Sequence, residues 1–322
     1  MKRLAGPWFG PAAGVLLLAA YVGAAQAAVP DSLFVEGVEL RASARVAGMG
    51  GAFVGLADDG AALFYNPAGL AGLRGLELHG VKIEGPELAG APGFASSHRT
   101  VLLAAARGVG IGAMRMEIPP ESSEQSEWEG LKGAVGLAIP LGPLAVGVTG
   151  NYLVDKAGPL GDERGSGWLA DAGALIELGP LRLGAVLRGV AGEFRTSRRG
   201  GPESLDLAYY RQTVYGAALR LGFATLALDY ALPAGWWGQG TAPHLRAGVE
   251  MRLGPVSLRA GVSRHRPEGL QLYPEMHTLG ASLSLGPLRA DLAVAEPWRE
   301  GDPPWGAGAA ERVQSLSIRL AF

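Results

Sequence analysis

The most constraining feature of this sequence is a series of short segments, from Gly75 to the C-terminus, in which apolar and polar residues alternate. Between residues 244 and 253 every second residue is apolar, and Arg246, Glu250 and Arg252 lie among the residues in between. Successive side chains of a β-strand point to opposite faces of the sheet, so a period of two residues predicts a strand. Residues 256–263 repeat the pattern.

Tight turns separate many of these segments. The tripeptide Leu-Gly-Pro recurs at 141–143, 178–180, 253–255 and 285–287. A two-residue type II′ turn needs a positive φ at its first central position, which Gly accepts, and the fixed φ of Pro suits the second. The turns therefore predict β-hairpins.

Counting the alternating segments predicts fourteen strands, most of them about ten residues long. A tilted strand of about that length crosses a bilayer. The expected strands lie near 75–84, 98–107, 109–117, 130–140, 143–153, 168–178, 181–190, 211–222, 223–232, 244–253, 255–264, 276–285, 287–296 and 311–322.

The connections between these strands alternate between tight turns and longer segments. Bacterial outer-membrane barrels have short periplasmic turns and long external loops. The sequence therefore predicts an all-β fold, a transmembrane up-and-down antiparallel β-barrel that spans residues 75–322. An even number of strands returns the C-terminus to the periplasmic side.

The N-terminus has the pattern of a secretory signal peptide. Lys2 and Arg3 precede an apolar stretch over residues 12–25, and Ala25-Gln26-Ala27 supplies a small-x-small cleavage site. We expect residues 1–27 to be removed on export, although a short membrane anchor is the alternative. The predicted location is the bacterial outer membrane.

Composition and charge argue against several other classes of protein. The chain is 48% hydrophobic and only 18% charged, so it is too apolar for a disordered protein. No apolar run after the first thirty residues reaches the roughly 20 residues of a spanning helix. The net charge of −2 gives no basis for binding nucleic acid, and the chain has no cysteine.

Aromatic residues and the C-terminal strand favour a membrane barrel over a soluble β-sandwich. Most Trp and Tyr residues lie in the expected long loops or beside them, where an interfacial aromatic belt is expected. The last strand alternates through Leu316, Ile318 and Leu320 to a terminal Phe322. This ending resembles the signal that the barrel assembly machinery recognises, so that machinery is an expected partner, together with outer-membrane lipids.

The polar face of the expected strands is rich in charged residues. A charge that faces lipid at mid-bilayer costs about 2–4 kcal/mol for Arg or Lys, so these side chains must face the lumen. The candidate luminal polar residues are Arg182, Arg220, Arg246, Glu250, Arg252 and Arg259.

Cofactor, metal and enzyme chemistry find no support in the sequence. His244, His265 and His277 fall near the external ends of neighbouring strands, but they lack metal-ligand spacing and no serine-nucleophile motif accompanies them. We expect no cofactor, no metal and no enzymatic activity. A further cluster, Arg195, Arg198 and Arg199, falls in an expected long loop over 191–210, where it meets the anionic outer leaflet, surface polysaccharide or solvent.

Residues 28–74 lack the hairpin pattern and contain the run Gly48-Met49-Gly50-Gly51-Ala52, followed by Ala57-Asp58-Asp59 and by Asn66-Pro67-Ala68-Gly69-Leu70. A dinucleotide-binding fingerprint is excluded because Phe53 stands where its third Gly would be. The run resembles the signature of the FadL/PorV-like outer-membrane proteins. That resemblance implies a fourteen-stranded barrel whose N-terminal segment enters the lumen as a plug.

The resemblance makes the plug motif a candidate for gating or ligand binding. Pro67 restricts Asn66 to extended conformations, so the pair forms a defined turn. Asp58 and Asp59 either cap a short helix over Gly60–Leu63 or pair with inward arginines. The motif either locks the plug or moves to open a route. The candidate residues are Asp58, Asp59, Asn66, Pro67, Ala68 and Gly69.

Two functions follow from the resemblance. The first is passive transport or binding of a hydrophobic or amphipathic, fatty-acid-like small molecule across the outer membrane. The second is a PorV/PorQ-like component of type IX secretion or surface attachment, in which the barrel is a scaffold for secreted proteins. The chain is closer in size to PorV-like proteins, and the long capture loops of FadL-type proteins are not obvious.

Overall fold

The computed structural model describes residues 42–86, 96–118, 128–157, 163–198, 201–205, 212–233, 244–265, 275–298 and 312–322. The expected signal peptide and the first part of the plug lie outside these residues. None of the helices within the described ranges is both long enough and apolar enough to cross a membrane.

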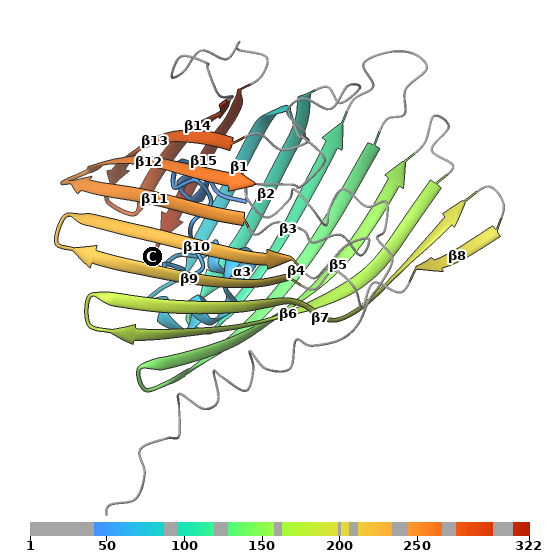
Figure 1. The fold of residues 1–322 in the computed structure, drawn as a ribbon, viewed down its shortest axis with the longest axis horizontal. Helices are drawn as coiled ribbons and strands as arrows, with labels where there is room; N and C mark the ends of the chain where they lie inside the picture. The colour runs from blue at the N-terminus through green and yellow to red at the C-terminus, as the bar shows by residue number, and fades with distance from the viewer. Residues whose placement is uncertain are drawn as a thin grey trace, which may run out of the picture.

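Fifteen antiparallel strands form one sheet (Figure 1). They are β1 (Glu77–Pro86), β2 (Ser96–Ala106), β3 (Val109–Ile118), β4 (Trp128–Leu141), β5 (Leu144–Ala157), β6 (Glu163–Leu178), β7 (Leu181–Arg198), β8 (Gly201–Leu205), β9 (Gln212–Leu221), β10 (Ala224–Pro233), β11 (His244–Leu253), β12 (Val256–His265), β13 (Glu275–Leu285), β14 (Leu288–Trp298) and β15 (Val313–Ala321).

Fourteen of these strands close into a barrel. Each strand pairs with the next along the chain, β7 pairs with both β6 and β9, and β1 pairs with β15 to close the ring. The prediction of a fourteen-stranded antiparallel barrel is therefore confirmed, and the strand positions agree with the predicted ones to within about five residues except at the end of β7.

The predicted loop over 191–210 is wrong. Strand β7 has 18 residues and runs on to Arg198, where it pairs with the short strand β8 (Figure 1). Only Leu181 to Arg188 of β7 pair with β9, so β8 and the second half of β7 extend beyond the ring. Thr196 and Ser197 continue the strand, but the polar residues there carry no alternation that would have predicted it.

The predicted type II′ turns are confirmed by their backbone. Gly142 and Pro143 connect the paired residues Leu141 and Leu144, and Gly142 has a φ of 67°. The glycines of the other three Leu-Gly-Pro turns have φ values between 59° and 64°. We call this end of the barrel the short-turn end, and the opposite end the long-loop end.

Side chains alternate between the two faces of the barrel wall. Leu102 and Ile111 point outward and are 62% and 60% exposed, whereas Val101 and Leu103 point into the barrel and are buried. An apolar outer surface of this kind is stable only against lipid. Two aromatic cross-strand pairs lie on this outer face, Tyr152 with Trp168 and Tyr215 with Tyr230.

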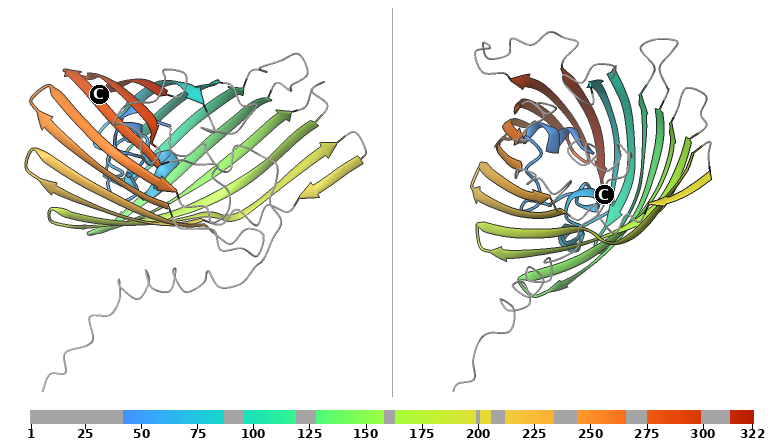
Figure 2. Two further views of the ribbon diagram at one scale, coloured as in Figure 1. Left: turned by 45° about the horizontal axis from the view of Figure 1, so that its top comes forward. Right: turned by 45° about the vertical axis from the view of Figure 1, so that its right-hand side comes forward.

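The described part of the N-terminal segment lies inside the barrel (Figure 2). It contains helix α2 (Ala44–Gly48), helix α3 (Ala62–Tyr65) and the 3-10 helix η2 (Pro67–Gly72). We call residues 42–74 the plug. The predicted helix over Gly60–Leu63 instead begins at Ala62, because Asp59 Oδ1 accepts a hydrogen bond from the Ala61 backbone N–H (3.0 Å) in the turn that precedes α3.

Candidate functional site

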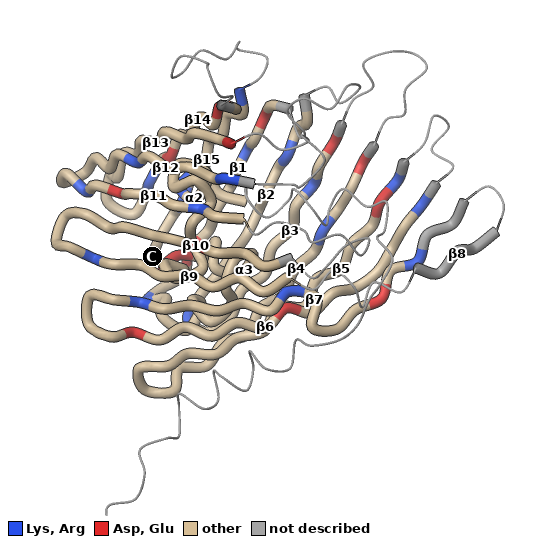
Figure 3. The backbone as a smooth tube through the Cα atoms, viewed as in Figure 1, with Lys and Arg blue, Asp and Glu red and all other residues tan. Residues whose placement is uncertain are grey.

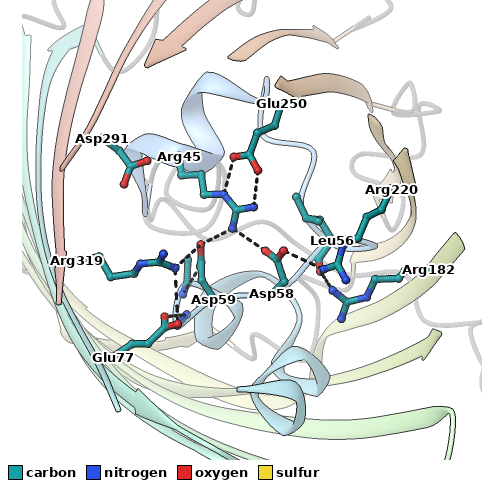
Figure 4. A network of polar contacts seen from close by, with 12 residues as sticks. Arg45, Leu56, Asp58, Asp59, Glu77, Arg182, Arg220, Glu250, Asp291 and Arg319 are labelled. Atoms are coloured by element: carbon teal, nitrogen blue, oxygen red, sulfur yellow. Dashed lines mark hydrogen bonds and ion pairs between the residues drawn. The ribbon is translucent and has the colours of Figure 1, made fainter. Parts of the chain in front are cut away.

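Arg45 of helix α2 is the centre of an ion-pair network between the plug and the wall (Figure 4). Its guanidinium donates two hydrogen bonds to Glu250 on β11, from Nε (3.0 Å) and from Nη2 (3.1 Å). Its Nη1 donates to Asp58 (2.6 Å) and to Asp59 (2.7 Å) within the plug. Arg45 is buried, and so are Asp59 and Glu250. One cation therefore joins two adjacent carboxylates of the plug to a wall carboxylate that is 205 residues away in the sequence.

Wall residues near the short turns extend this network. Arg220 donates to Asp58 (2.9 Å), and Arg259 donates to Glu250 (2.7 Å). Arg252 contacts Glu250 (2.7 Å) and lies 3.7 Å from Asp58. Because Arg220 and Arg252 lie at strand ends beside short turns, the network sits toward the short-turn end of the lumen.

The structure brings most of the predicted luminal polar residues to the plug. Arg182 donates to the Leu56 carbonyl oxygen of the plug. Arg182, Arg246, Glu250 and Arg259 are buried, whereas the side chains of Arg220 and Arg252 are 38% and 45% exposed. Arg182, Arg220, Glu250 and Arg252 contact plug residues directly, whereas Arg259 is joined to the plug through Glu250.

Asn66 makes three hydrogen bonds, one of which ties the plug motif to the wall. Its Nδ2 donates to the carbonyl oxygens of Val54 (2.9 Å) and Ala174 (3.1 Å), and its Oδ1 accepts from the Ala68 backbone N–H (3.2 Å). Asn66 has an extended backbone with φ −148° and ψ 100°, as the residue before a proline is expected to have. Pro67, Ala68 and Gly69 begin helix η2 and are buried.

Asp229 on β10 makes a contact with the plug that the sequence analysis did not predict. Its fully buried carboxylate accepts hydrogen bonds from the backbone N–H groups of Phe53 (2.7 Å) and Val54 (2.9 Å). Alternation indicated that Asp229 faces inward, but its partners are backbone groups. Backbone donors carry no residue signature, so no sequence pattern could have assigned this contact.

Glycines on the inner face of the wall allow the plug backbone to approach closely. A Cβ atom at Gly147 would lie 2.5 Å from the Pro67 carbonyl carbon, and one at Gly216 would clash with the backbone nitrogen of Gly55. Any larger residue would push the plug away from the wall. Several of these glycines face each other on neighbouring strands, as in Gly147–Gly173, Gly184–Gly216 and Gly248–Gly261.

The lumen has two chemically different sides. The inner face of β9–β15 carries most of the ion-pair network described above. The inner face of β1–β7 supplies most of the wall residues of one buried apolar cluster, which also includes the apolar residues of the plug. The larger wall residues of this cluster are Val81, Ile83, Val101, Leu103, Met114, Met116, Leu153, Leu169, Phe194 and Val313, and those of the plug are Met49, Phe53, Leu56, Leu63, Phe64, Tyr65 and Leu70.

Charged and titratable residues also lie on the inner face of β1–β7, and the buried ones are His79, Arg99, Lys132, Asp155, Asp171, Arg182 and Arg188. The Lys132 ammonium lies 5.9 Å from the centre of the Phe64 ring, and Arg188 donates to the carbonyl oxygens of Phe64 (3.2 Å) and Tyr65 (3.3 Å). Both cations therefore hold helix α3 against the wall. Within the described ranges, no group of three or more His, Asp or Glu side chains has the arrangement of a metal site.

The network around Arg45 makes the stability of the plug depend on pH. Burial alone would raise the pKa of Asp59, but the positive charge of Arg45, followed by those of His79 and Arg319, outweighs it and holds that pKa well below its usual range. The pKa of Asp58 is likewise lowered, chiefly by Arg45 against the effect of burial. A carboxylate with a depressed folded-state pKa stabilises the folded protein above its unfolded-state pKa, about 4.

We therefore expect the free energy of unfolding to change little between about pH 7 and pH 5 on account of these two groups, and to fall as the pH drops below about 4. Denaturant unfolding of the detergent-purified protein at a series of pH values measures this. In Asp59→Asn the decrease at low pH should be shallower. An equally steep decrease in this variant would show that Asp59 does not contribute.

Comparisons with known proteins define the class of the fold. No protein-family model matches the sequence, and no curated protein matches it. The structure resembles the Pseudomonas putida toluene transporter TodX, with a TM-score of 0.59 and 14% identity over 87% of this chain and 98% of that one. It also resembles the CymD monoaromatic hydrocarbon channel (0.63, 14%, 89% and 98%) and the Ralstonia pickettii toluene transporter TbuX (0.59, 15%, 87% and 98%).

The chain therefore has the fold of a FadL-type fourteen-stranded transmembrane barrel. At 14–15% identity this likeness establishes the fold alone. The fourteen-stranded barrel that the resemblance implied is confirmed, and a relationship to PorV or PorQ is not shown.

Proposed function

We propose that this protein is an outer-membrane barrel through which hydrophobic small molecules pass without energy input. The observation that carries the proposal is the two-sided lumen, in which the plug is bonded to the charged wall of β9–β15 and packs on the apolar wall of β1–β7. An apolar ligand seated against this cluster would contact mainly apolar side chains. The fold that this chain shares with hydrocarbon transporters also supports the proposal.

The pairing of β6 with β7 offers this ligand a way out through the wall. The register shifts between Ala170 and Ala172, which pair with Ala191 and Leu187. Asp171 Oδ1 fills part of the interruption by accepting a hydrogen bond from the Gly189 backbone N–H (2.9 Å). Strands joined by fewer backbone hydrogen bonds separate at lower cost. A sideways exit here would avoid the charged short-turn end.

We further propose that the Asn66–Gly69 motif locks the plug in place and does not itself contact the ligand. The motif is buried, and Asn66 is bonded to a plug carbonyl and to a wall carbonyl. Gly147 and Gly173 also leave no space between the motif and the wall. In this role Asp58 and Asp59 hold the plug through Arg45.

A charge in the buried apolar cluster tests the transport proposal. Phe194 lies in the second half of β7, which extends beyond the ring, and it is 1% exposed and belongs to the apolar cluster. In liposomes that contain purified protein, we expect Phe194→Asp to slow uptake of toluene or of a long-chain fatty acid by about tenfold, which corresponds to about 1.4 kcal/mol of barrier. Phe194→Leu is the matched control and should retain most of the uptake.

Comparing the uptake of toluene with that of the fatty acid would also show which class of ligand the protein prefers. The apolar cluster by itself favours neither an aromatic hydrocarbon nor a fatty acid. Equal uptake by empty liposomes and by liposomes with protein would refute transport. If that protein instead bound the C-terminal domain of a secreted protein, the PorV/PorQ-like scaffold function would replace it.

A further inference from the structure

Strand β7 loses its backbone pairing on both sides at one point of the wall. Its pairing with β9 ends at Arg188, which pairs with Gln212. Its pairing with β6 is interrupted over residues 188–190. In the register of the described residues, Gly189 and Val190 are therefore the two residues of β7 without a cross-strand partner on either side. We call this point the β7 break.

The backbone bends at the break. Gly189 has a φ of 59°, a conformation that residues with a side chain rarely adopt. From here β7 continues past the end of β9 toward β8 (Figure 1). On the other side of the break, Asp171 of β6 lies opposite residues 188–190, and Figure 3 shows charged residues in this part of both strands.

The Asp171 carboxylate takes the place of the interrupted backbone pairing. Its Oδ1 accepts the hydrogen bond from the Gly189 backbone N–H (2.9 Å), and its Oδ2 accepts one from Asn151 Nδ2 on β5 (3.0 Å). Asp171 and Asn151 are both buried. One side chain therefore closes the break, and Asn151 fixes the direction in which that side chain points.

Arg188, which directly precedes the break, is bonded to the plug. As described above, its guanidinium donates to the carbonyl oxygens of Phe64 and Tyr65 at the end of helix α3. If α3 moved away from the wall, this buried cation would lose two acceptors unless its own backbone moved with the helix. Because Gly189 is the next residue, such a movement would pull the Gly189 N–H away from Asp171.

The break has apolar surroundings on both of its sides. Leu169 of β6 and Phe194 of β7 lie near it on the inner face and belong to the apolar cluster. On the outer face Val190 is 38% exposed, and its neighbours Ala170 and Ala191 are small. Separation of β6 from β7 here would join the apolar cluster to the lipid without passing the charged short-turn end.

We propose that Asp171 and Arg188 form a latch, which keeps the β7 break closed while α3 lies against the wall and releases it when α3 moves. This inference rests on the proposed function, because it names the residues that control the sideways exit of the ligand. Arg188 acts through Gly189 and senses the plug, whereas Asp171 holds the wall. Movement of the plug and opening of the wall are then a single coupled event.

Hydrogen–deuterium exchange of the detergent-purified full chain tests the latch without any ligand. Asp171→Ala removes the acceptor of the Gly189 N–H, and Arg188→Met removes the two bonds to α3. Each should speed exchange at residues 189–190 by about tenfold, because local opening becomes easier. Asp171→Ala should also speed exchange in α3, since coupling between two sites is reciprocal. The contacts described for Asp171 are all with wall residues.

Arg182→Met is the matched control. Arg182 is on the same strand and also donates to a plug carbonyl oxygen, that of Leu56, but it pairs regularly with both β6 and β9. Exchange at the break should therefore stay within about threefold of that in the unmodified protein. Folding of each variant is checked by its heat-modifiable migration in gel electrophoresis. Equal acceleration at the break by Arg182→Met and Arg188→Met, or unchanged exchange of α3 in Asp171→Ala, would refute the latch.

A disulfide across the break tests the exit itself, and the chain has no cysteine of its own. Ala170→Cys with Ala191→Cys links the paired residues on the long-loop side of the break, whereas Ala174→Cys with Ala185→Cys links a regular pair of the same two strands. In the liposome assay with toluene, oxidation should slow uptake about tenfold in the first variant, because opening of the wall then limits the rate. The second variant should change little, and reduction should restore the first.

The outcomes separate the latch from transport. Uptake that the disulfide at the break leaves unchanged would overturn the latch and leave the transport proposal intact. If neither variant took up toluene or fatty acid in its reduced form, and the unmodified protein did not either, the transport proposal would fail instead. The exchange experiment would still decide whether Asp171 and Arg188 couple the plug to the wall.

Discussion

Arg45→Met should destabilise the plug more than any other single substitution in the charged network. The substitution keeps most of the side-chain volume beside Phe53 but removes the only described cation that contacts all three of Asp58, Asp59 and Glu250. Breaking a buried ion pair by removing one partner costs about 3–5 kcal/mol, because the remaining charges stay buried. We expect a loss of that size in the free energy of unfolding.

Denaturant unfolding of the detergent-purified variant measures this loss. Planar-bilayer recording provides a second readout, because a loosened plug should raise the ionic conductance above the closed level of the unmodified protein. Both changes are expected together if the network holds the plug in the lumen.

Arg252→Met is the matched control. Arg252 also contacts Glu250 and approaches Asp58, but its side chain is 45% exposed, and an exposed ion pair contributes about 0–1 kcal/mol. The two substitutions should therefore differ in free energy by at least about 2 kcal/mol. Similar losses in both variants would show that Arg45 has no special role.

Gly147→Val should displace the plug sterically. A Cβ atom at position 147 would lie 2.5 Å from the Pro67 carbonyl carbon and 2.6 Å from the Ala68 nitrogen, and both of these are backbone atoms of the plug. Backbone atoms cannot rotate out of the way as a side-chain tip can, so the plug must shift. Overpacking costs about 1–3 kcal/mol or more, and the β-branched residue itself suits a strand. The barrel should still fold.

The expected readouts are raised conductance and faster protease cleavage within residues 42–74, with the heat-modifiable barrel retained. Gly150→Val on the same strand is the control, since Gly150 faces outward and has no atom within 4 Å of the added Cβ. It should resemble the unmodified protein. If Gly147→Val left conductance and cleavage unchanged, the close fit between plug and wall would not hold the plug in place.

The local features of the barrel could be predicted from the sequence because they depend on neighbouring residues. A period of two fixes which side chains share a face, and Gly-Pro fixes the turn, so the fourteen barrel strands and the type II′ turns followed directly. The β7–β8 extension did not follow. Its strands are held by pairing with each other and with β6, and not by a hydrophobic pattern of their own.

The candidate site could be predicted only in part. The inward direction of Arg182, Arg246, Glu250 and Arg259 followed from alternation together with the cost of placing charge against lipid. Arg45 carried no such signal, because the plug has no period from which the direction of its side chain could be inferred. Its partner Glu250 is 205 residues away in the sequence.

The sequence by itself determined which side chains of each strand face lipid and which face the lumen, because side-chain direction in a strand is a property of the backbone. It also determined that neighbouring strands are joined as hairpins. Only the tertiary structure decided that Asp229 and Asn66 bond backbone groups and that paired glycines receive the plug. It also decided that the lumen has one charged and one apolar side. These contacts depend on how the plug is oriented within the closed ring, and that orientation is set by many distant residues at once.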